Sequence, residues 1–253
     1  MDECYEDQAS KIHALETGLS SDPPMNWRLS SLDRYTLISN SDSHSPQPHR
    51  LGREANVFEL KEPNYWDIVE AIRVKDPNRL LLTIETWPEY GKYHWTGHRA
   101  CGVSLPPSEA LKIGNRCPKC GGKLTVGVEQ RVEELADRPP GYRPPDTPGY
   151  IHLLPLQELI SVALGVSMGS KRVQTLYSRL LQAFGDEFKV MLEAPIDAIG
   201  KVSEPVVAQA IDAVRRDAVK VTPGYDGVYG VIELPRGDPE EPERREGLEG
   251  WMP

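Results

Sequence analysis

The run Tyr35-Thr36-Leu37-Ile38-Ser39-Asn40-Ser41-Asp42-Ser43-His44 decides how the first part of this chain is interpreted. Its first four residues are aromatic, β-branched or aliphatic, which predicts a strand. Side chains two positions apart on a strand point to the same face. Asp42 and His44 are therefore expected to aim a carboxylate and an imidazole at one point, as ligands for a divalent metal. The alternative is a turn, in which Asp42 caps a loop and His44 lies on the surface.

The Asp42/His44 pair is half of a hydrolytic metal site, because such centres use more than two protein ligands. The chain contains six histidines, at positions 13, 44, 49, 94, 98 and 152, and no two of them form a His-x-His pair. We therefore expect the missing ligands to lie outside this chain.

A second strand and a helix are predicted downstream of this run. Leu80-Leu81-Leu82-Thr83-Ile84 has strand character, and the stretch Trp66–Ile72 has helical spacing, with Ile68 and Ile72 four positions apart. This βα alternation is typical of a parallel α/β unit. The sequence therefore predicts an α/β fold for residues 1–86.

Two short chelating pairs follow, His98-x2-Cys101 and Cys117-x2-Cys120, separated by fifteen residues. Each spacing lets a tight turn place two ligands on one ion, and two such turns complete a tetrahedron. Four protein ligands close the coordination sphere, so the predicted zinc is structural and not catalytic. The segment is interpreted as a zinc ribbon.

Several details of this ribbon stay open. Gly121-Gly122 permits the tight loop expected after the second pair. His94 or a water could replace His98 as the fourth ligand. The alternative for the whole group is a set of free or buried thiols, although a metal site is favoured over disulfides in a chain without a secretory signal. Cys4 is expected to be an ordinary thiol.

Beyond residue 138 a Pro-rich stretch leads into a helical region. Residues 139–149 contain five prolines, which forbid a helix and favour extended chain. Three apolar stripes with helical spacing follow, and Pro205 suits the first turn of the third. A turn at 224–227 precedes a short predicted strand at 229–234. The stripes are Leu156, Leu159, Ile160 and Ala163; Leu176, Leu180 and Phe184; and Val206, Val207, Ala210, Ile211 and Val214.

The stretch Gly165-Val166-Ser167-Met168-Gly169-Ser170-Lys171-Arg172 invites a nucleotide-binding interpretation. Its spacing is wrong for a P-loop, since three residues separate the glycines, Ser170 precedes the lysine, and no strand comes before it. The favoured functional interpretation is a phosphate seat, in which a helix N-terminus is supplemented by Lys171 and Arg172. The alternative is an ordinary helical bundle with solvated basic side chains.

Composition and charge limit the class of protein. Hydrophobic residues make up 39% of the 253 residues, which fits a globular protein, and no apolar run is long enough for a membrane helix. The formal net charge of −9 argues mildly against a general nucleic-acid binder. The acids are unevenly placed, however, and residues 151–182 hold one acid against three basic residues, so a local basic face can exist. We expect a cytoplasmic protein with no membrane partner.

Three stretches resemble a known family, namely Glu16–Trp27, Leu32–Pro46 and Leu51–Asn56. They closely resemble endonuclease Q, a family of archaeal and bacterial DNA-repair nucleases with a polymerase-and-histidinol-phosphatase (PHP) catalytic domain. The resemblance continues through the ribbon and the helical region to about Ile232. In the ribbon it is carried by 91–101, 127–128 and 131–138.

The resemblance implies an α/β fold whose first part is the C-terminal part of a PHP-type α/β barrel, followed by a zinc ribbon and a small helical domain. The early His-x-His of the family is absent, so the matched part lacks the N-terminal PHP motifs. The implied division is 1–86 for the barrel part, 87–138 for the ribbon, 139–150 for a Pro-rich linker and 151–235 for a helical DNA-contacting domain. Beyond the resemblance, composition predicts a disordered acidic tail at 236–253.

The activity implied by the resemblance is metal-dependent hydrolysis of the phosphodiester on the 5′ side of a deaminated base or abasic site. Asp42 and His44 would hold catalytic zinc, manganese or magnesium, while His98, Cys101, Cys117 and Cys120 would hold structural zinc. Substrate would be bound by Glu16, Ser20 and Ser21 near the base and by His49, Arg50, Arg53, Lys171 and Arg172 near phosphate.

Damaged DNA is the expected partner, together with the missing N-terminal part of the catalytic domain and with replication or repair proteins. Because the upstream ligands are missing, we expect little or no cleavage by these 253 residues alone. Two alternatives stay open at this point. One is a noncatalytic DNA-binding fragment made of the ribbon and the helices, and the other is a PHP-type phosphoesterase of small metabolites.

Overall fold

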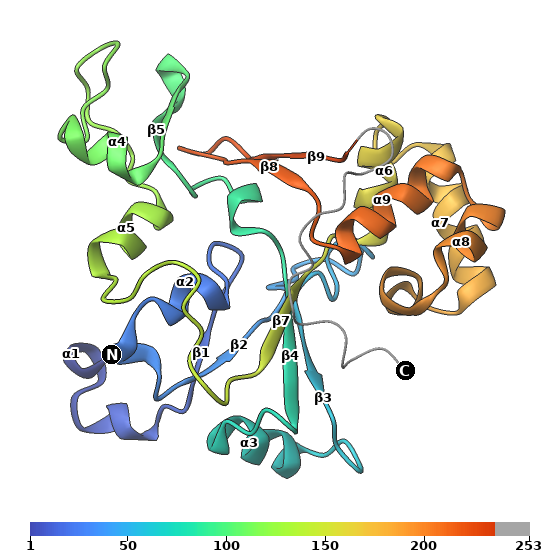
Figure 1. Cartoon of the computed structure of the whole chain (residues 1–253), viewed down its shortest axis with the longest axis horizontal. Coiled ribbons are helices and arrows are strands. Elements are labelled where there is room, and N and C mark those ends of the chain that lie inside the picture. The colour runs from blue at the N-terminus through green and yellow to red at the C-terminus, as the bar shows by residue number, and fades with distance from the viewer. Residues whose placement is uncertain (236–253) are drawn as a thin grey trace. The chain divides into compact units, whose positions relative to one another are not determined.

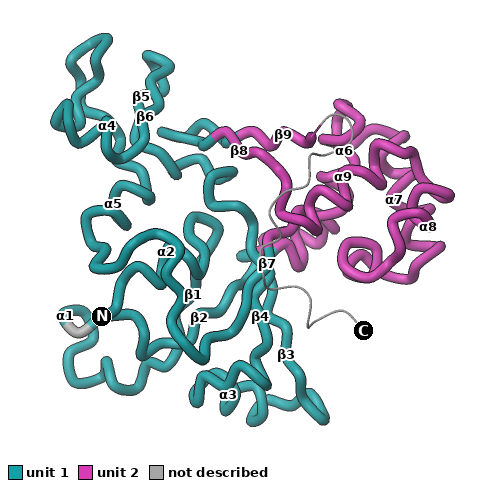
Figure 2. The backbone as a smooth tube through the Cα atoms, in the orientation of Figure 1, with its two compact units in different colours: residues 1–42, 54–151, 223–230 teal, residues 43–53, 152–222, 231–253 magenta. Residues whose placement is uncertain are grey.

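The computed structural model describes residues 1–235, which fold into two compact units (Figure 2). The first unit contains residues 1–42, 54–151 and 223–230, and the second contains 43–53, 152–222 and 231–235. Each unit thus combines segments that are far apart in the sequence. The domain boundaries predicted above stay predictions, and the predicted acidic tail at 236–253 lies outside the described residues.

The first unit begins with short helices and a pair of parallel strands (Figure 1). Strand β1 lies beside β2 with Ala14 opposite Thr36 and Glu16 opposite Ile38. Tyr35 and Thr36 are each 1% exposed, which explains why this run is apolar and β-branched. The elements are α1 (Asp2–Tyr5), η1 (Glu6–Lys11), β1 (Ala14–Glu16), α2 (Pro23–Trp27), η2 (Ser30–Leu32) and β2 (Thr36–Ile38).

The first unit also contains a three-stranded sheet in the order β3-β4-β7. It consists of β3 (Ala55–Phe58), β4 (Leu80–Glu85) and β7 (Gly149–His152), and helix α3 (Tyr65–Val74) connects β3 to β4. The strand predicted at 80–84 and the helix at 66–72 are confirmed. The predicted parallel arrangement is wrong here, because β3 and β4 pair antiparallel. Parallel pairing is found between β1 and β2.

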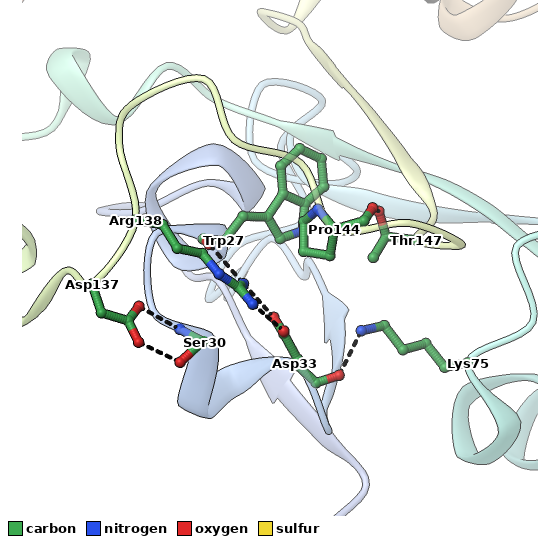
Figure 3. Close-up of polar contacts among 8 residues, drawn as sticks. All are labelled: Trp27, Ser30, Asp33, Lys75, Asp137, Arg138, Pro144 and Thr147. Atoms are coloured by element: carbon green, nitrogen blue, oxygen red, sulfur yellow. Dashed lines mark hydrogen bonds and ion pairs between the residues drawn. The ribbon is translucent and has the colours of Figure 1, made fainter.

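The chain between the ribbon and β7 is fixed to the first helices by polar contacts (Figure 3). Arg138 Nη1 donates to Asp33 Oδ1 at 2.8 Å and to the carbonyl of Trp27 at 3.2 Å. Asp137 accepts a hydrogen bond from the backbone N–H of Ser30 at 2.8 Å. Hydrogen bonding from Arg138 lowers the pKa of Asp33 below its usual value.

The Pro-rich stretch forms no helix, as predicted, but turns at 140–141 and 145–146 interrupt the expected extended chain. The stretch is part of the first unit. The hydroxyl of Thr147 is buried and donates to the carbonyl of Pro144 at 3.0 Å. The guanidinium of Arg143 lies 5.5 Å from the ring centroid of Trp27. The stretch then runs directly into β7.

The ribbon segment contains two antiparallel strands and several short helices. Strands β5 and β6 pair with Thr96 opposite Leu105 and His98 opposite Val103. Val103, Cys117 and Leu124 form a small apolar cluster inside the ribbon. The elements are η3 (Pro88–Tyr90), β5 (Thr96–His98), η4 (Arg99–Cys101), β6 (Val103–Leu105), α4 (Pro107–Lys112) and α5 (Val128–Leu135).

The second unit is mainly helical, and the helices predicted from the three apolar stripes are confirmed as α6, α7 and α9, although Val206 of the third stripe is 39% exposed. Leu156, Leu180 and Ile211 are fully buried, and Pro205 occupies the first turn of α9. The strand predicted at 229–234 is present as β9 and pairs antiparallel with β8. The elements are α6 (Leu156–Leu164), α7 (Lys171–Phe184), η5 (Lys189–Glu193), α8 (Ile196–Val202), α9 (Pro205–Arg215), β8 (Lys220–Thr222) and β9 (Val231–Glu233).

None of the helices described between residues 1 and 235 has both the length and the apolar character needed to span a membrane.

Candidate functional site

The four residues of the predicted zinc ribbon come together. His98 ends β5, Cys101 ends η4, and Cys117 and Cys120 flank the second turn. One ligand atom from each of these four residues lies within 4.8 Å of the others. His98 Nδ1 lies 3.5 Å from Cys120 Sγ. The spacing argument is thereby confirmed at the level of geometry, because both x2 pairs converge on one point.

The second turn of the ribbon has a backbone suited to this convergence. The N–H of Cys117 donates to the carbonyl of Gly122 at 2.7 Å, and the N–H of Gly121 returns to the carbonyl of Cys117 at 2.8 Å. Gly121 has a φ of 74°, a left-handed conformation that costs a glycine little. The tight loop brings Cys120 back beside Cys117.

The donor set fits a soft or borderline metal ion such as zinc, because three thiolates and one imidazole are typical zinc ligands. Proximity to the other two cysteines raises the pKa of the Cys101 thiol to about 11. Burial opposes ionisation of Cys117, but hydrogen bonds from backbone N–H groups and from His98 outweigh it and lower this pKa to about 6. Cys117 is therefore prepared for metal binding, whereas an ion would have to displace the proton of Cys101.

The alternative fourth ligand, His94, is occupied elsewhere. Its side chain is 4% exposed, and its Nε2 lies 3.4 Å from a carboxylate oxygen of Glu129. It does not belong to the metal-ligand cluster. His98 is thus the imidazole that the cluster contains.

Asp42 and His44 do not lie on a strand as the first interpretation supposed. Strand β2 ends at Ile38, and Asp42 has a φ of 44°, in the left-handed region that aspartate tolerates better than most residues. The alternation rule therefore does not apply, and that part of the prediction is wrong. Both side chains are exposed. Within the described residues, the ribbon cluster is the one group of three or more potential metal ligands, so Asp42 and His44 do not form such a group.

A polar network lies directly before Asp42. The amide side chain of Asn56 accepts a hydrogen bond from the N–H of Ser39 at 2.9 Å and donates to the Ser39 carbonyl at 2.7 Å. Asn56 also donates to the Asn40 side chain at 3.3 Å, and Asn40 donates to Glu16 Oε1 at 3.2 Å. Asn56 thereby replaces a strand partner for the chain that leaves β2. Sequence reasoning did not identify it.

Glu85 contacts the same segment through its hydrogen bond with Ser39. It is fully buried on β4, and its Oε2 accepts hydrogen bonds from Thr17 Oγ1 at 3.0 Å and Ser39 Oγ at 2.9 Å. Burial, together with the nearby carboxyl of Glu54, raises the pKa of Glu85 to about 7. Glu85 was not predicted, and an acid at the end of an apolar strand run is the signal that could have identified it.

Of the residues proposed near the base, Glu16 and Ser20 are exposed, while Ser21 is partly buried. The hydroxyl of Ser21 donates to the carbonyl of Thr17 at 2.7 Å and accepts from Asn26 at 3.0 Å. Ser21 is therefore engaged in holding its own loop. A role of these three residues in substrate binding stays a prediction.

The segment that contains His44, His49, Arg50 and Arg53 belongs to the second unit. Arg53 lines a small hollow of about 60 Å³ together with apolar residues and with Glu187. The hollow is further lined by Leu51, Gly52, Leu153, Leu154, Pro155, Phe188 and Met191.

Glu187 is a partly buried acid with two hydrogen-bond donors. It accepts hydrogen bonds from the N–H of Leu156 at 2.6 Å and from the hydroxyl of Tyr177 at 3.0 Å. Burial raises the pKa of Glu187, and the hydrogen bonds from Leu156 and Tyr177 act in the opposite direction. Glu187 thereby joins the start of α6 to α7.

At the predicted phosphate-binding position at the start of α7, two residues, Ser170 and Arg172, make hydrogen bonds within the protein. Ser170 caps the helix by accepting a hydrogen bond from the N–H of Val173 at 3.3 Å. Arg172 Nε donates to Glu204 at 2.8 Å, which neutralises its charge locally. Lys171 is exposed. Of the two predicted cations, one is thus paired with an acid, while the role of both in phosphate binding stays a prediction.

Comparison with solved structures gives two similar proteins, and both are endonuclease Q. Two solved structures match 93% of this chain at 39% sequence identity. One is the lesion-specific endonuclease PfuEndoQ from Pyrococcus furiosus, with a TM-score of 0.85, and the other is endonuclease Q in complex with a 27-mer duplex substrate that has an abasic lesion at the active site, with a TM-score of 0.81. The chain resembles endonuclease Q.

The resemblance covers part of each larger protein. The chain spans 57% and 58% of the two endonuclease Q chains. The uncharacterized protein MJ0043 of Methanocaldococcus jannaschii is 35% identical over 259 residues, which cover 99% of this chain and 32% of that protein. The uncharacterized protein YqxK of Bacillus subtilis is 31% identical over 225 residues, which cover 88% of this chain and 53% of that protein. Residues 155–218 match the family model of the MJ0043 C-terminal domain.

Proposed function

We propose that this protein is a DNA-repair endonuclease of the endonuclease Q type, which hydrolyses the phosphodiester on the 5′ side of a deaminated base or abasic site. The observation that supports this proposal most strongly is the match to a lesion-specific endonuclease over 93% of the chain, at 39% identity and a TM-score of 0.85. At this identity over nearly the whole chain, the similarity extends beyond fold architecture to the amino-acid sequence.

In this proposal Asp42 and His44 are ligands of the catalytic metal ions. A carboxylate and an imidazole suit zinc or manganese, and a carboxylate suits magnesium. Such ions, when bound, activate water and stabilise charge on the phosphoryl group. Because both side chains are exposed and form no larger ligand group within residues 1–235, catalysis needs ligands beyond these two.

The remaining predicted site residues bind substrate in this proposal. Glu16, Ser20 and Ser21 would contact an extruded base, and His49, Arg50, Arg53, Lys171 and Arg172 would contact phosphate. The network of Asn56 and Asn40 supports the proposed base site, because it fixes the position of the Glu16 carboxylate through a 3.2 Å hydrogen bond.

The proposal is tested by binding and cleavage of a duplex with a single uracil, hypoxanthine or abasic site, against the undamaged duplex, with added manganese, magnesium or zinc. We expect tighter binding of damaged duplexes but little or no cleavage by the 253 residues alone. Any cleavage should fall 5′ of the lesion and disappear in Asp42→Asn. The matched control is Asp197→Asn on α8, whose side chain is 76% exposed. Equal binding of damaged and intact DNA, with no cleavage, would contradict the proposal.

The origin of the further ligands is a separate question with a direct test. An in-frame His-x-His encoded immediately upstream of Met1 would supply them from the same polypeptide, and the longer product should then cleave. Robust cleavage by the 253-residue chain itself would refute the statement that catalysis needs metal ligands beyond those in this chain. If the longer product binds lesions without cleaving them, the noncatalytic DNA-binding protein is the better description.

A further inference from the structure

The ribbon is strongly basic in an otherwise acidic chain. Residues 91–125 contain six lysine or arginine residues and one acid, Glu109, whereas the whole chain has a formal charge of −9. All six basic residues are exposed. Arg116 and Lys119 donate to ribbon carbonyls, at 3.2 Å and 2.8 Å, and so help to hold the two metal-binding turns. These two hydrogen bonds involve two of the six basic side chains, and the segment as a whole is positively charged.

Three exposed side chains on one side of this segment form what we term the ribbon platform, namely Lys92, Tyr93 and Tyr229. The ammonium of Lys92 lies 5.5 Å from the ring centroid of Tyr93 and 5.8 Å from that of Tyr229. The two tyrosines are 44% and 63% exposed. Their rings are thus available to a ligand, while cation–π attraction holds the lysine between them.

The ribbon platform is assembled by a turn from the far end of the sequence. Residues 223–230 belong to the same compact unit as the ribbon (Figure 2). Trp95 donates its N–H to Gly224, Gly227 donates to the carbonyl of Lys92, and Gly230 donates to that of Tyr90, at 2.8–3.1 Å. Tyr229 is therefore fixed beside Lys92 by backbone hydrogen bonds on both sides.

Arg99 adds a second cation at the edge of the ribbon platform. A Cβ at Gly227 would lie 3.4 Å from Arg99 Nη1 and 3.9 Å from the hydroxyl of Tyr93, so both groups surround this glycine. Asp226 accepts from the backbone N–H of Arg99 at 2.6 Å and from the hydroxyl of Thr125 at 2.7 Å. The carboxylate of Asp226 thus holds the ribbon turn in place.

We propose that the ribbon platform binds an exposed strand of DNA, with phosphate at Lys92 and an unstacked base or sugar against the tyrosine rings. Alternating cations and exposed aromatic faces are the chemistry that holds unpaired strands without sequence preference. Another exposed aromatic pair, Tyr65 and Trp66 at 68% and 74% exposure, begins a helix whose acids Asp67 and Glu70 pair with the nearby Arg79. This inference rests on the proposed function, because it assumes that the protein encounters opened DNA.

The test is the affinity of the whole zinc-loaded chain for a fluorescent single-stranded oligonucleotide and for an abasic duplex, measured as a function of salt. We expect Tyr229→Ala to weaken single-strand binding about 5- to 150-fold, and Tyr229→Phe to restore it, because the ring is retained. Lys92→Gln should reduce the magnitude of the salt slope by about 0.7, the loss of one phosphate contact. The matched controls are Lys112→Gln for charge and Trp66→Ala for an exposed ring.

The possible outcomes separate this inference from the proposed function. If the unmodified chain binds neither DNA, both fail. If it binds DNA but Tyr229→Ala and Lys92→Gln bind as well as the unmodified chain, the ribbon platform alone is refuted. Equal losses in Lys112→Gln would also refute it, because charge anywhere on the ribbon would then suffice. Unchanged zinc content and circular dichroism in each variant show that the fold is intact.

Discussion

Replacement of the buried acid Glu85 by glutamine is expected to stabilise the protein at alkaline pH. Glu85 is fully buried, and its pKa is raised from 4.5 to about 7. In the unfolded chain this carboxyl ionises at a lower pH than in the folded chain. The free energy of unfolding therefore falls as pH rises from about 4.5, and the contribution of Glu85 becomes constant above about 7. Glutamine has nearly the same shape and still accepts hydrogen bonds from Thr17 and Ser39, but it has no proton to lose.

The magnitude follows from the size of the shift. A difference of 2.5 between the two pKa values is worth about 3 kcal/mol once both states are ionised, and most of this develops between pH 5 and pH 8. Relative to the unmodified protein, Glu85→Gln should therefore gain roughly 2–3 kcal/mol in free energy of unfolding between these two values of pH. The exposed Glu62→Gln should show no such gain.

Urea denaturation followed by tryptophan fluorescence is the suitable assay. Four of the five tryptophans, at positions 27, 66, 87 and 95, lie in the first unit together with Glu85, so the signal reports on the unit that is perturbed. The unfolding free energies of both proteins are compared at pH 5 and pH 8. A difference between Glu85→Gln and the unmodified chain that stays constant with pH would refute the assignment of a raised pKa to Glu85.

Three further outcomes are expected. Cys117→Ser should reduce bound zinc below one equivalent and lower the melting temperature, and a chelator should have the same effects on the unmodified chain. Cys4→Ser is the control and should leave zinc content and melting temperature unchanged. Metal analysis and thermal melting measure these two quantities. Gly97→Ala should cost about 1–3 kcal/mol, because its Cβ would lie 2.4 Å from a tyrosine ring atom, while Gly169→Ala has no atom within 4 Å and should be near neutral in urea denaturation. Ser170→Ala should cost about 1 kcal/mol by removing the cap of α7, and equal urea midpoints would contradict that role.

The sequence alone determined the features that depend on neighbouring residues. The two x2 pairs predicted the group of four potential metal ligands, because the two residues of each pair are brought together by one local turn. Helical periodicity predicted α6, α7 and α9, because an apolar stripe must face a core. The segments around Asp42 and the ribbon likewise sufficed to indicate the resemblance to endonuclease Q.

Other features were decided by contacts between distant parts of the chain. The antiparallel pairing of β3 with β4 was mispredicted, because periodicity specifies a strand but not its partner. The strand at Ile38 ends where Asn56 takes over the hydrogen bonds of Ser39, so the geometry of Asp42 depends on a residue seventeen positions away from Ser39.

The roles of Glu85 and Tyr229 were likewise decided by tertiary structure. Burial raises the pKa of Glu85, and the amino-acid type of one position does not reveal how far water is excluded from it. Tyr229 reaches Lys92 across more than a hundred residues because the turn at 223–230 returns to the ribbon. Local chemistry thus determined which ligands and helices this protein has, whereas burial and long-range backbone pairing decided which side chains act together.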